Sequence, residues 1–339
     1  MTPVRAIGVA ILATLILGCE SATQDDNGTP RPAADPVVVY AAYTDKTYLP
    51  ALFSAYTQET GVTVIVRNGK PSKIVDDVIA NRISPPADVL WATSVTGAWR
   101  AAEEGELRPL RLPGMADNVM PVLRDTDNYW TAVSYHKAAI IYNPKLIEPP
   151  EQFSFADLAT PDFANLLCLS SSANNINQAV IATLIDTSQV RDAEIVVRGW
   201  MSNLAMPVFA GEGDLIAAIQ SGECGVGIAT GTVAIRAAAD DSDVAIFVPR
   251  TTAADAEAVG VTRHGQNPDG GTALVEWLLS ADVQSRHARS RQVLPANWTV
   301  QPPEELRELE TATTGETGVI IVAVDRHDAQ LLAERARYR

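Results

Sequence analysis

The chain has 339 residues, of which 41 are acidic and 26 basic, and its formal net charge is −15. This charge argues against nucleic acid as a partner, because nucleic-acid affinity comes mostly from Lys and Arg side chains that neutralise phosphates. The length leaves room for two domains of ordinary size.

Residues 1–18 are predicted to be a signal peptide. The apolar run at 6–17 has the length of a signal-peptide core and is shorter than the ~20 residues of a membrane span. A glycine directly before Cys19 is typical of a lipobox, so we expect cleavage there and a lipid thioether on Cys19. The alternative is an ordinary signal peptide with an incidental cysteine. Residues 19–36 are polar and are predicted to be a flexible tether on the extracytoplasmic side of a membrane.

Strand-like apolar runs alternate with amphipathic stretches in the next part of the chain. Strands are predicted at 37–40, 62–66 and 88–91, and helices at 48–59, 72–81 and 95–104. This alternation predicts an α/β fold with a mostly parallel sheet. Ligands bind such sheets outside the carboxyl ends of the strands, so the loops at 41–46 and 92–96 are candidate ligand-binding segments.

A long predicted strand at 129–142 marks a crossing into a second lobe, and residues 244–248 are predicted to cross back. Further elements are predicted as helices at 176–185, 193–204, 214–221, 271–290 and 325–337 and a strand at 226–229. We therefore expect two lobes. Lobe 1 comprises 37–132 plus about 249–299, and lobe 2 comprises about 133–248 plus 300–339.

Two cysteines other than Cys19 remain, Cys168 and Cys224. In an exported chain such a pair most often forms a disulfide, and two buried thiols are the alternative. Their spacing matches no zinc-binding pattern.

Several segments together resemble the bacterial ferric-iron-binding periplasmic proteins in order and spacing. They are Pro86–Leu90, Trp99–Ala101, Leu167–Ser170, Asn177–Ala179, Val197–Ala205, Ala217–Ile228, Pro268–Ala281 and Leu294–Asn297. The resemblance covers roughly residues 37–339. It implies a two-lobed periplasmic-binding-protein fold, in which each lobe is a mostly parallel sheet flanked by helices and two crossing strands join the lobes. It also implies that Cys168 and Cys224 are bonded.

The metal ligands of that family are missing from this chain. The family binds Fe³⁺ through second-lobe tyrosines, whose positions here hold Ile176, Thr232 and Val233. Fe³⁺ requires anionic oxygen ligands, which these side chains cannot supply. We therefore expect a small hydrogen-bonding solute, with no cofactor and no metal. A metal held by Tyr43, Asp45 and His136 remains an alternative.

The residues predicted to contact the solute carry hydroxyl, amide, carboxylate or imidazole groups. They are Tyr43, Thr44, Asp45, Ser94, His136, Ser172, Asn174, Asn175, Thr230 and Thr232. Some have a structural alternative, since one residue of 170–175 is expected to cap the following helix. Trp91 is expected in the core, and stacking on a ligand is the alternative. The other histidines, His264, His287 and His327, are expected at the surface.

The resemblance implies the substrate-binding component of an ABC importer, a monomer that delivers its solute to a permease and its ATPase. A sensor that presents its ligand to a membrane partner is the alternative. The sequence contains no Gly-x-Ser-x-Gly, His-Glu-x-x-His or phosphate-loop motif, and we therefore do not expect an enzyme.

Overall fold

The computed structural model describes residues 35–43, 47–82, 84–314 and 318–339. The predicted signal peptide, Cys19, Thr44 and Asp45 lie outside the described residues. Within the described part, none of the helices combines the length and the apolar character that a membrane span requires. Residues 35–339 form one compact unit, and the boundaries of the two lobes remain predictions.

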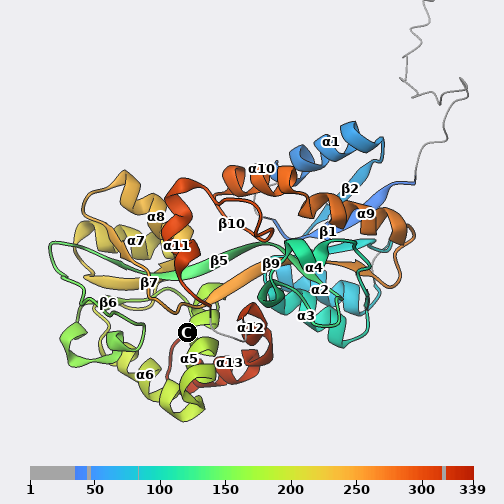
Figure 1. The fold of residues 1–339 in the computed structure, drawn as a ribbon. Helices are drawn as coiled ribbons and strands as arrows, with labels where there is room; N and C mark the ends of the chain where they lie inside the picture. The colour runs from blue at the N-terminus through green and yellow to red at the C-terminus, as the bar shows by residue number, and fades with distance from the viewer. Residues whose placement is uncertain (1–34, 44–46, 83, 315–317) are drawn as a thin grey trace, which may run out of the picture. The chain divides into compact units, whose positions relative to one another are not determined.

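Ten strands belong to the central sheet of this unit (Figure 1). They are β1 (Val37–Ala41), β2 (Val64–Asn68), β3 (Val89–Ala92), β4 (Leu107–Arg108), β5 (Thr131–Tyr142), β6 (Leu167–Cys168), β7 (Val226–Thr230), β8 (Ala245–Phe247), β9 (Ala254–Thr262) and β10 (Leu294–Pro295). The main order is β2-β1-β3-β9-β5-β7-β6. The pairs β1–β2, β1–β3 and β6–β7 are parallel, whereas β9 runs antiparallel to both β3 and β5.

Helices flank this sheet. They are α1 (Tyr48–Thr60), α2 (Pro71–Ile79), α3 (Val95–Glu103), α4 (Met115–Asn118), α5 (Asn175–Ser188), α6 (Val190–Ser202), α7 (Glu212–Ser221), α8 (Gly231–Asp240), α9 (Pro268–Leu279), α10 (Ala281–Arg291), α11 (Arg307–Thr311), α12 (Ile321–Val324) and α13 (Arg326–Arg335). The single helix predicted at 271–290 is wrong. Ser280 adopts an extended conformation, so α9 ends at Leu279 and α10 begins at Ala281.

The two long central strands connect the two parts of the sheet. Residues 131–137 of β5 pair with β9, and residues 138–142 of the same strand pair with β7 and β8. The prediction that 244–248 cross back is wrong, because β8 pairs only with the far half of β5. The long return strand is β9, which joins β3 to β5.

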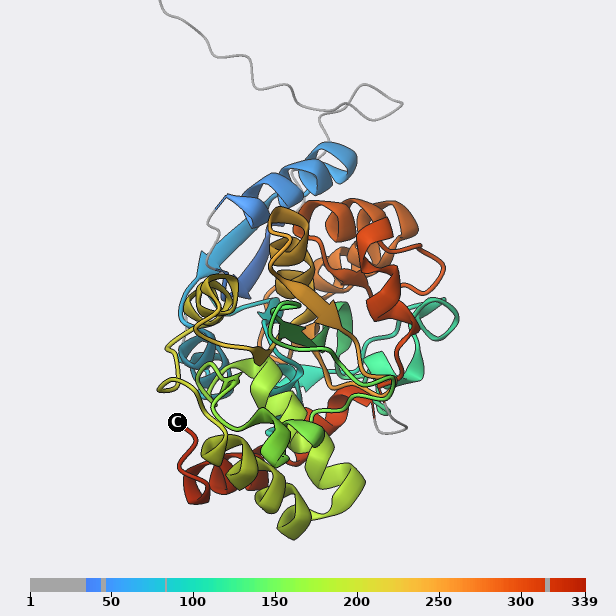
Figure 2. The same ribbon diagram turned by 90° about the vertical axis from the view of Figure 1, so that its left-hand side faces the viewer.

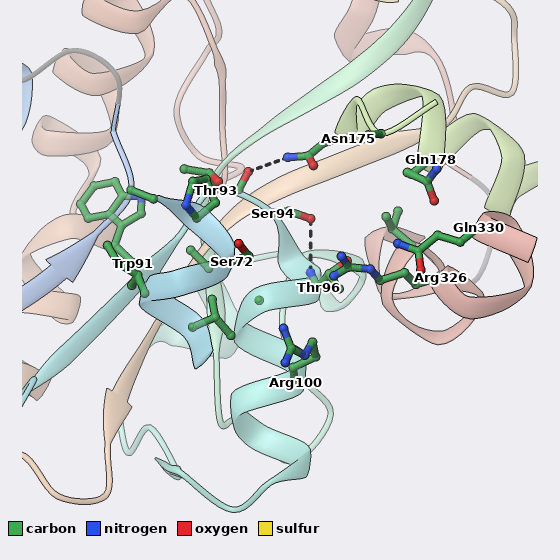
Figure 3. Close-up of a pocket in the computed structure, with 18 residues that line it drawn as sticks. Ser72, Trp91, Thr93, Ser94, Thr96, Arg100, Asn175, Gln178, Arg326 and Gln330 are labelled. Carbon is green, nitrogen blue, oxygen red and sulfur yellow. Dashed lines mark hydrogen bonds between the residues drawn. The ribbon is translucent and has the colours of Figure 1, made fainter. Parts of the chain in front are cut away.

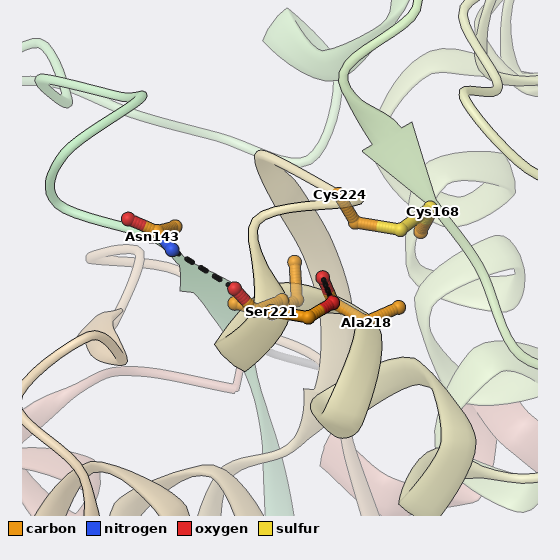
Figure 4. The surroundings of a disulfide bond; sticks show 6 residues. Asn143, Cys168, Ala218, Ser221 and Cys224 are labelled. Atoms are coloured by element: carbon orange, nitrogen blue, oxygen red, sulfur yellow. Dashed lines mark hydrogen bonds between the residues drawn. A yellow bond between two sulfur atoms is a disulfide. The ribbon is translucent and has the colours of Figure 1, made fainter.

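A disulfide joins Cys168 on β6 to Cys224 after α7, as expected from the sequence, with Cα atoms 5.9 Å apart (Figure 4). Both cysteines are fully buried in a small apolar cluster that includes Ile141, Leu215 and Ile219. The bond therefore ties the end of β6 to the loop that follows α7 inside an apolar cluster.

The segment after residue 300 returns to the middle of the sheet. Lys137 of β5 is buried, and its ammonium donates to the carbonyls of Leu309, Glu310 and Ala312 at 2.8, 2.9 and 2.6 Å. Farther along, α13 packs on α5 and α6, and α12 packs on both α3 and α5. In both views the red C-terminal helices lie against the yellow-green helices (Figures 1 and 2). The segment thus contacts elements on both sides of β5 and β9.

Candidate functional site

A cavity of about 470 Å³ lies where α2, α3, α5 and α13 meet (Figure 3). One wall comes from β3 and from the first turns of α2 and α3. The facing wall comes from the start of α5 and from α12 and α13. The lining mixes apolar side chains such as Ile74 and Val322 with hydroxyl, amide and guanidinium groups. Such a composition suits a small ligand with a few polar groups.

The turn from β3 into α3 provides the hydroxyl-bearing wall. Ser94 caps α3, because its side chain accepts a hydrogen bond from the Thr96 amide at 3.4 Å. The Ser94 hydroxyl also donates to Asp255 of β9 at 3.1 Å. Burial raises the pKa of Asp255 to about 6. Gly97 lets α3 approach closely, since a Cβ there would lie 2.9 Å from Ala92 and Val75.

The start of α5 supplies amide groups from the opposite side. Asn174 caps this helix by accepting from the Ile176 amide at 3.0 Å, which is a structural role. Asn175 lines the cavity, and its amide nitrogen lies 3.4 Å from the Thr93 carbonyl across it (Figure 3). The Ser172 carbonyl accepts a hydrogen bond from the side-chain nitrogen of Gln178. Gln178 also lines the cavity.

Trp91 lines the cavity and also contacts a buried carboxylate, Glu257. The phenol of Tyr43 donates to Glu257 Oε2, and Trp91 Nε1 donates to the same oxygen at 3.2 Å. His136 Nε2 lies 3.9 Å from the other carboxylate oxygen. Burial would raise the pKa of Glu257, but His136, His287 and the Tyr43 hydrogen bond lower it to well below its usual range. Two predicted residues, Tyr43 and His136, therefore meet here rather than in the cavity.

The pKa of Tyr43 describes this cluster in the absence of a cation. Burial and the adjacent Glu257 raise that pKa far above its ordinary value, so without a bound metal ion Tyr43 is a neutral hydrogen-bond donor. Among the residues that the structure describes, no group of three or more His, Cys, Asp or Glu side chains is placed to hold a metal ion. Asp45, the third member of the alternative metal set, lies outside those residues.

His287 is not the surface residue that the sequence predicted. It is only 3% exposed, and its Nδ1 contacts the Tyr48 hydroxyl. Its ring lies 6.1 Å from the ring of Trp91, centroid to centroid. Burial lowers the pKa of His287 to about 4. Within α10 this ring lies on the helix face that packs against Trp91 of the sheet. Its sequence neighbours are mostly polar or charged, so the sequence alone suggested an exposed position.

The second-lobe threonines lie elsewhere. The amide and the hydroxyl of Thr230 both donate to Glu212 Oε1 at 2.8 Å, and the side chain of Thr232 is buried. Neither residue lines the cavity. Ile176, at a position where the family resemblance implies a metal-binding tyrosine, is also buried, with 2% of its surface exposed.

Residues 134–137 form a Ser-x-x-Lys sequence, which sequence reasoning overlooked and which occurs at some catalytic serines. Here the three carbonyls at 309–312 surround the Lys137 ammonium. Burial lowers the pKa of Lys137 to about 8, so at neutral pH it is a charged donor to those carbonyls. This arrangement explains Lys137 as an anchor for the C-terminal segment.

Sequence reasoning thus placed Ser94 and Asn175 at the cavity and missed other polar residues that line it. Thr93 and Thr96 also line the cavity and lie in the candidate segment at 92–96. The missed residues are Ser72, Arg100, Gln178, Arg326 and Gln330. Arg100 stands one helical turn after Thr96, and Gln178 nearly one turn after Asn175. These spacings place each pair on one helix face, so the prediction could have been extended from the first residue of each pair to the second. Arg326 has no such local signal.

Comparison with known proteins places this architecture among transport proteins. The family model for bacterial extracellular solute-binding proteins matches residues 51–314. The iron uptake protein A1 of Synechocystis is 26% identical over 72% of this chain and 71% of its own length. A putative 2-aminoethylphosphonate-binding periplasmic protein of Salmonella typhimurium is 25% identical over 79% of this chain and 80% of its own length.

A solved structure of a Trichodesmium protein (IdiA, FutA), in complex with iron and citrate, superposes with a TM-score of 0.82 and 25% identity. The match covers 90% of this chain and all of that one. These similarities confirm the predicted two-lobed periplasmic-binding-protein fold and the predicted likeness to ferric-iron-binding proteins.

Proposed function

This chain belongs to the bacterial extracellular solute-binding proteins, and we propose that it is the lipid-anchored substrate-binding component of an ABC importer. Its solute occupies the cavity between the β3–α3 turn and the helices α5 and α13. The observation that carries this proposal is that both sides of β5 and β9 contribute to the cavity wall. Small-molecule sites commonly lie in such a crevice.

The polar groups on this wall favour a small hydrogen-bonding solute over a bare ferric ion. Hydroxyl and amide groups of Ser94, Thr96 and Asn175 line the cavity, and each such hydrogen bond contributes ~0.5–1.5 kcal/mol net. A ferric ion beside these neutral dipoles and the two arginines of the wall would be an uncompensated charge in a partly dry site, which is costly. Relatives are named for iron and for a phosphonate. The organic solute class suits this cavity better.

Release of the solute requires the cavity to open. The two long strands β5 and β9 connect the halves of the sheet and are the natural hinge for closure around a ligand. The hydrogen bond from Asn175 to the Thr93 carbonyl crosses the cavity at 3.4 Å and would break on opening. We propose that a permease and its ATPase receive the solute, and that the lipid on Cys19 keeps the protein at the membrane.

Native mass spectrometry of the freshly purified protein tests solute binding. We expect a single small organic molecule to co-purify and to be lost when the protein is unfolded in acid. A preparation that carries no small molecule, and that shows no thermal stabilisation with any solute in a broad metabolite panel, would contradict the proposal.

Visible absorption tests the identity of the ligand. We expect a colourless protein that gains no visible band when ferric citrate is added, because no phenolate is available for charge transfer. A ferric-binding relative treated in parallel serves as the positive control. A reddish protein that retains iron through chelator washing would instead support the metal alternative.

A further inference from the structure

The charges on the cavity wall are unlike those of the whole chain. The chain carries 41 acidic and 26 basic residues, yet among the described residues that line this cavity the two ionisable ones are Arg100 and Arg326, and none is Asp or Glu. The charged side chains that the structure places on the cavity wall are therefore both cationic, although the chain as a whole is acidic. Such a set favours an anionic ligand.

Arg326 has its guanidinium unoccupied by protein partners. Among the described residues it makes no hydrogen bond or ion pair, and it extends from the start of α13 toward Thr96 and Arg100 (Figure 3). Burial and the charge of Arg100 lower the pKa of Arg326, while the charges of Asp255 and Asp76 oppose this effect. A guanidinium presents several fixed donors that match the oxygens of a carboxylate or phosphonate.

Arg100 has one carboxylate partner, which leaves the pair of arginines undercompensated. Its Nη2 lies 2.9 Å from Asp76 Oδ1, in an exposed ion pair. Asp255 does not line the cavity, and its Oδ1 already accepts hydrogen bonds from Ser94, Val95 and Ala256. An oxyanion between the two guanidiniums would supply the missing negative charge.

Gln178 indicates a second requirement. Its side-chain nitrogen donates to the Ser172 carbonyl, and this bond fixes which end of the amide is the oxygen. That oxygen, Oε1, is buried and has no hydrogen-bond partner among the described residues. A buried acceptor without a donor is unfavourable, so a ligand that fills the cavity should bring a donor to this position.

We propose that the solute is a small organic oxyanion that also carries a hydrogen-bond donor, such as an aminophosphonate or an amino acid of similar size. Arg100 and Arg326 bind its anionic group, and Gln178 Oε1 accepts from its amino group. This inference rests on the proposed function and adds the chemical class of the solute and the residues that select it.

Calorimetric titration with four matched probes tests the class. The probes are 2-aminoethylphosphonate, β-alanine, ethylphosphonate and ethanolamine. We expect one of the first two, which carry both groups, to bind, and their comparison distinguishes a phosphonate from a carboxylate. Ethylphosphonate lacks the amine and should bind about 10-fold more weakly than 2-aminoethylphosphonate. Ethanolamine lacks the anion and should not bind.

Variants then test the residues. For the probe that binds, Arg326→Gln should raise Kd by about 10- to 100-fold, since a hydrogen bond to a charged group is lost, and Arg326→Lys should lose less. Arg335→Gln, on the same helix but beside Glu194 at 3.8 Å, is the matched control and should leave Kd unchanged. Arg100→Gln provides a second variant if Arg326→Gln folds poorly by circular dichroism.

Three results would overturn the inference. One is that neither 2-aminoethylphosphonate nor β-alanine binds. Another is that ethanolamine binds as well as they do. The third is that Arg326→Gln and Arg335→Gln bind alike. If native mass spectrometry nevertheless finds a neutral solute in the protein, the proposed function stands and only the anionic class fails. Absence of any bound or binding small molecule would reject both.

Discussion

The buried His287 predicts how the stability of this protein depends on pH, and His287→Phe isolates its contribution. In the folded protein burial lowers the pKa of His287 from 6.5 to about 4. Glu257, Arg291 and His136 are the charged groups that also act on it. The unfolded chain takes up the proton near pH 6.5 and the folded chain only near pH 4. Between these values the unfolded state binds more protons, so the free energy of unfolding falls as the pH falls.

The magnitude follows from the width of that interval. One unit of pKa difference corresponds to about 1.4 kcal/mol. Protonation of His287 in the unfolded chain should therefore lower the free energy of unfolding of the wild type by ~3 kcal/mol between pH 7 and pH 4. Asp255 acts in the opposite direction, because its raised pKa of about 6 lets the folded state take up a proton first. The wild-type profile alone therefore hides the effect, and the difference between the wild type and His287→Phe reveals it.

Urea unfolding at several pH values measures this difference. Tryptophan fluorescence is a suitable signal, because Trp91 lies beside His287. As the pH drops from 7 to 4, the free energy of unfolding of the wild type should fall by ~3 kcal/mol more than that of His287→Phe. Parallel profiles, with a constant offset between the two proteins, would refute the assignment of a neutral buried histidine.

Three further predictions concern the anchor, the disulfide and the C-terminal segment. Cys19→Ala should move the protein from the membrane fraction to the soluble fraction, and a variant that still sediments with membranes would disprove the lipid anchor. Reduction of the Cys168–Cys224 bond, which spans a sequence separation of 56, should lower the free energy of unfolding by ~2–4 kcal/mol in urea titrations. Alkylation of two free thiols in the untreated protein would contradict this. Lys137→Met should accelerate amide hydrogen exchange at 307–313 by at least about 10-fold, because three carbonyls lose their shared cation. Unchanged protection there would show that Lys137 is not the anchor.

Local sequence patterns predicted the elements whose apolar residues are buried and whose polar residues are exposed. The apolar run at 37–40 forms most of β1. The helically spaced residues Leu49, Phe53 and Tyr56 form the buried face of α1. The strand β9 escaped prediction because it carries Asp255 and Glu257 at buried positions. Their partners, Ser94 and Trp91, are 161 and 166 residues away in sequence. No pattern within a short window reveals that such charges are compensated.

The candidate site divides in the same way. Ser94 and Asn175 were predictable, since each stands where a strand or loop leads into a helix, and such positions commonly face a ligand. Thr230 and Thr232 were placed by analogy with relatives and instead lie against Glu212 or in the core. Arg326 could not be predicted, because its position depends on how α12 and α13 pack on α3, α5 and α6.

The cavity wall draws on residues from Ala42 to Gln330, and this span has a consequence for biosynthesis. During translation the hydroxyl-bearing turn after β3 emerges more than 200 residues before Arg326 does. A partly synthesised chain therefore lacks one wall of the cavity and one of its two cations. If the cavity holds the solute as proposed, binding requires the segment at 322–330 to have docked, and a chain that is still being synthesised should therefore not bind it.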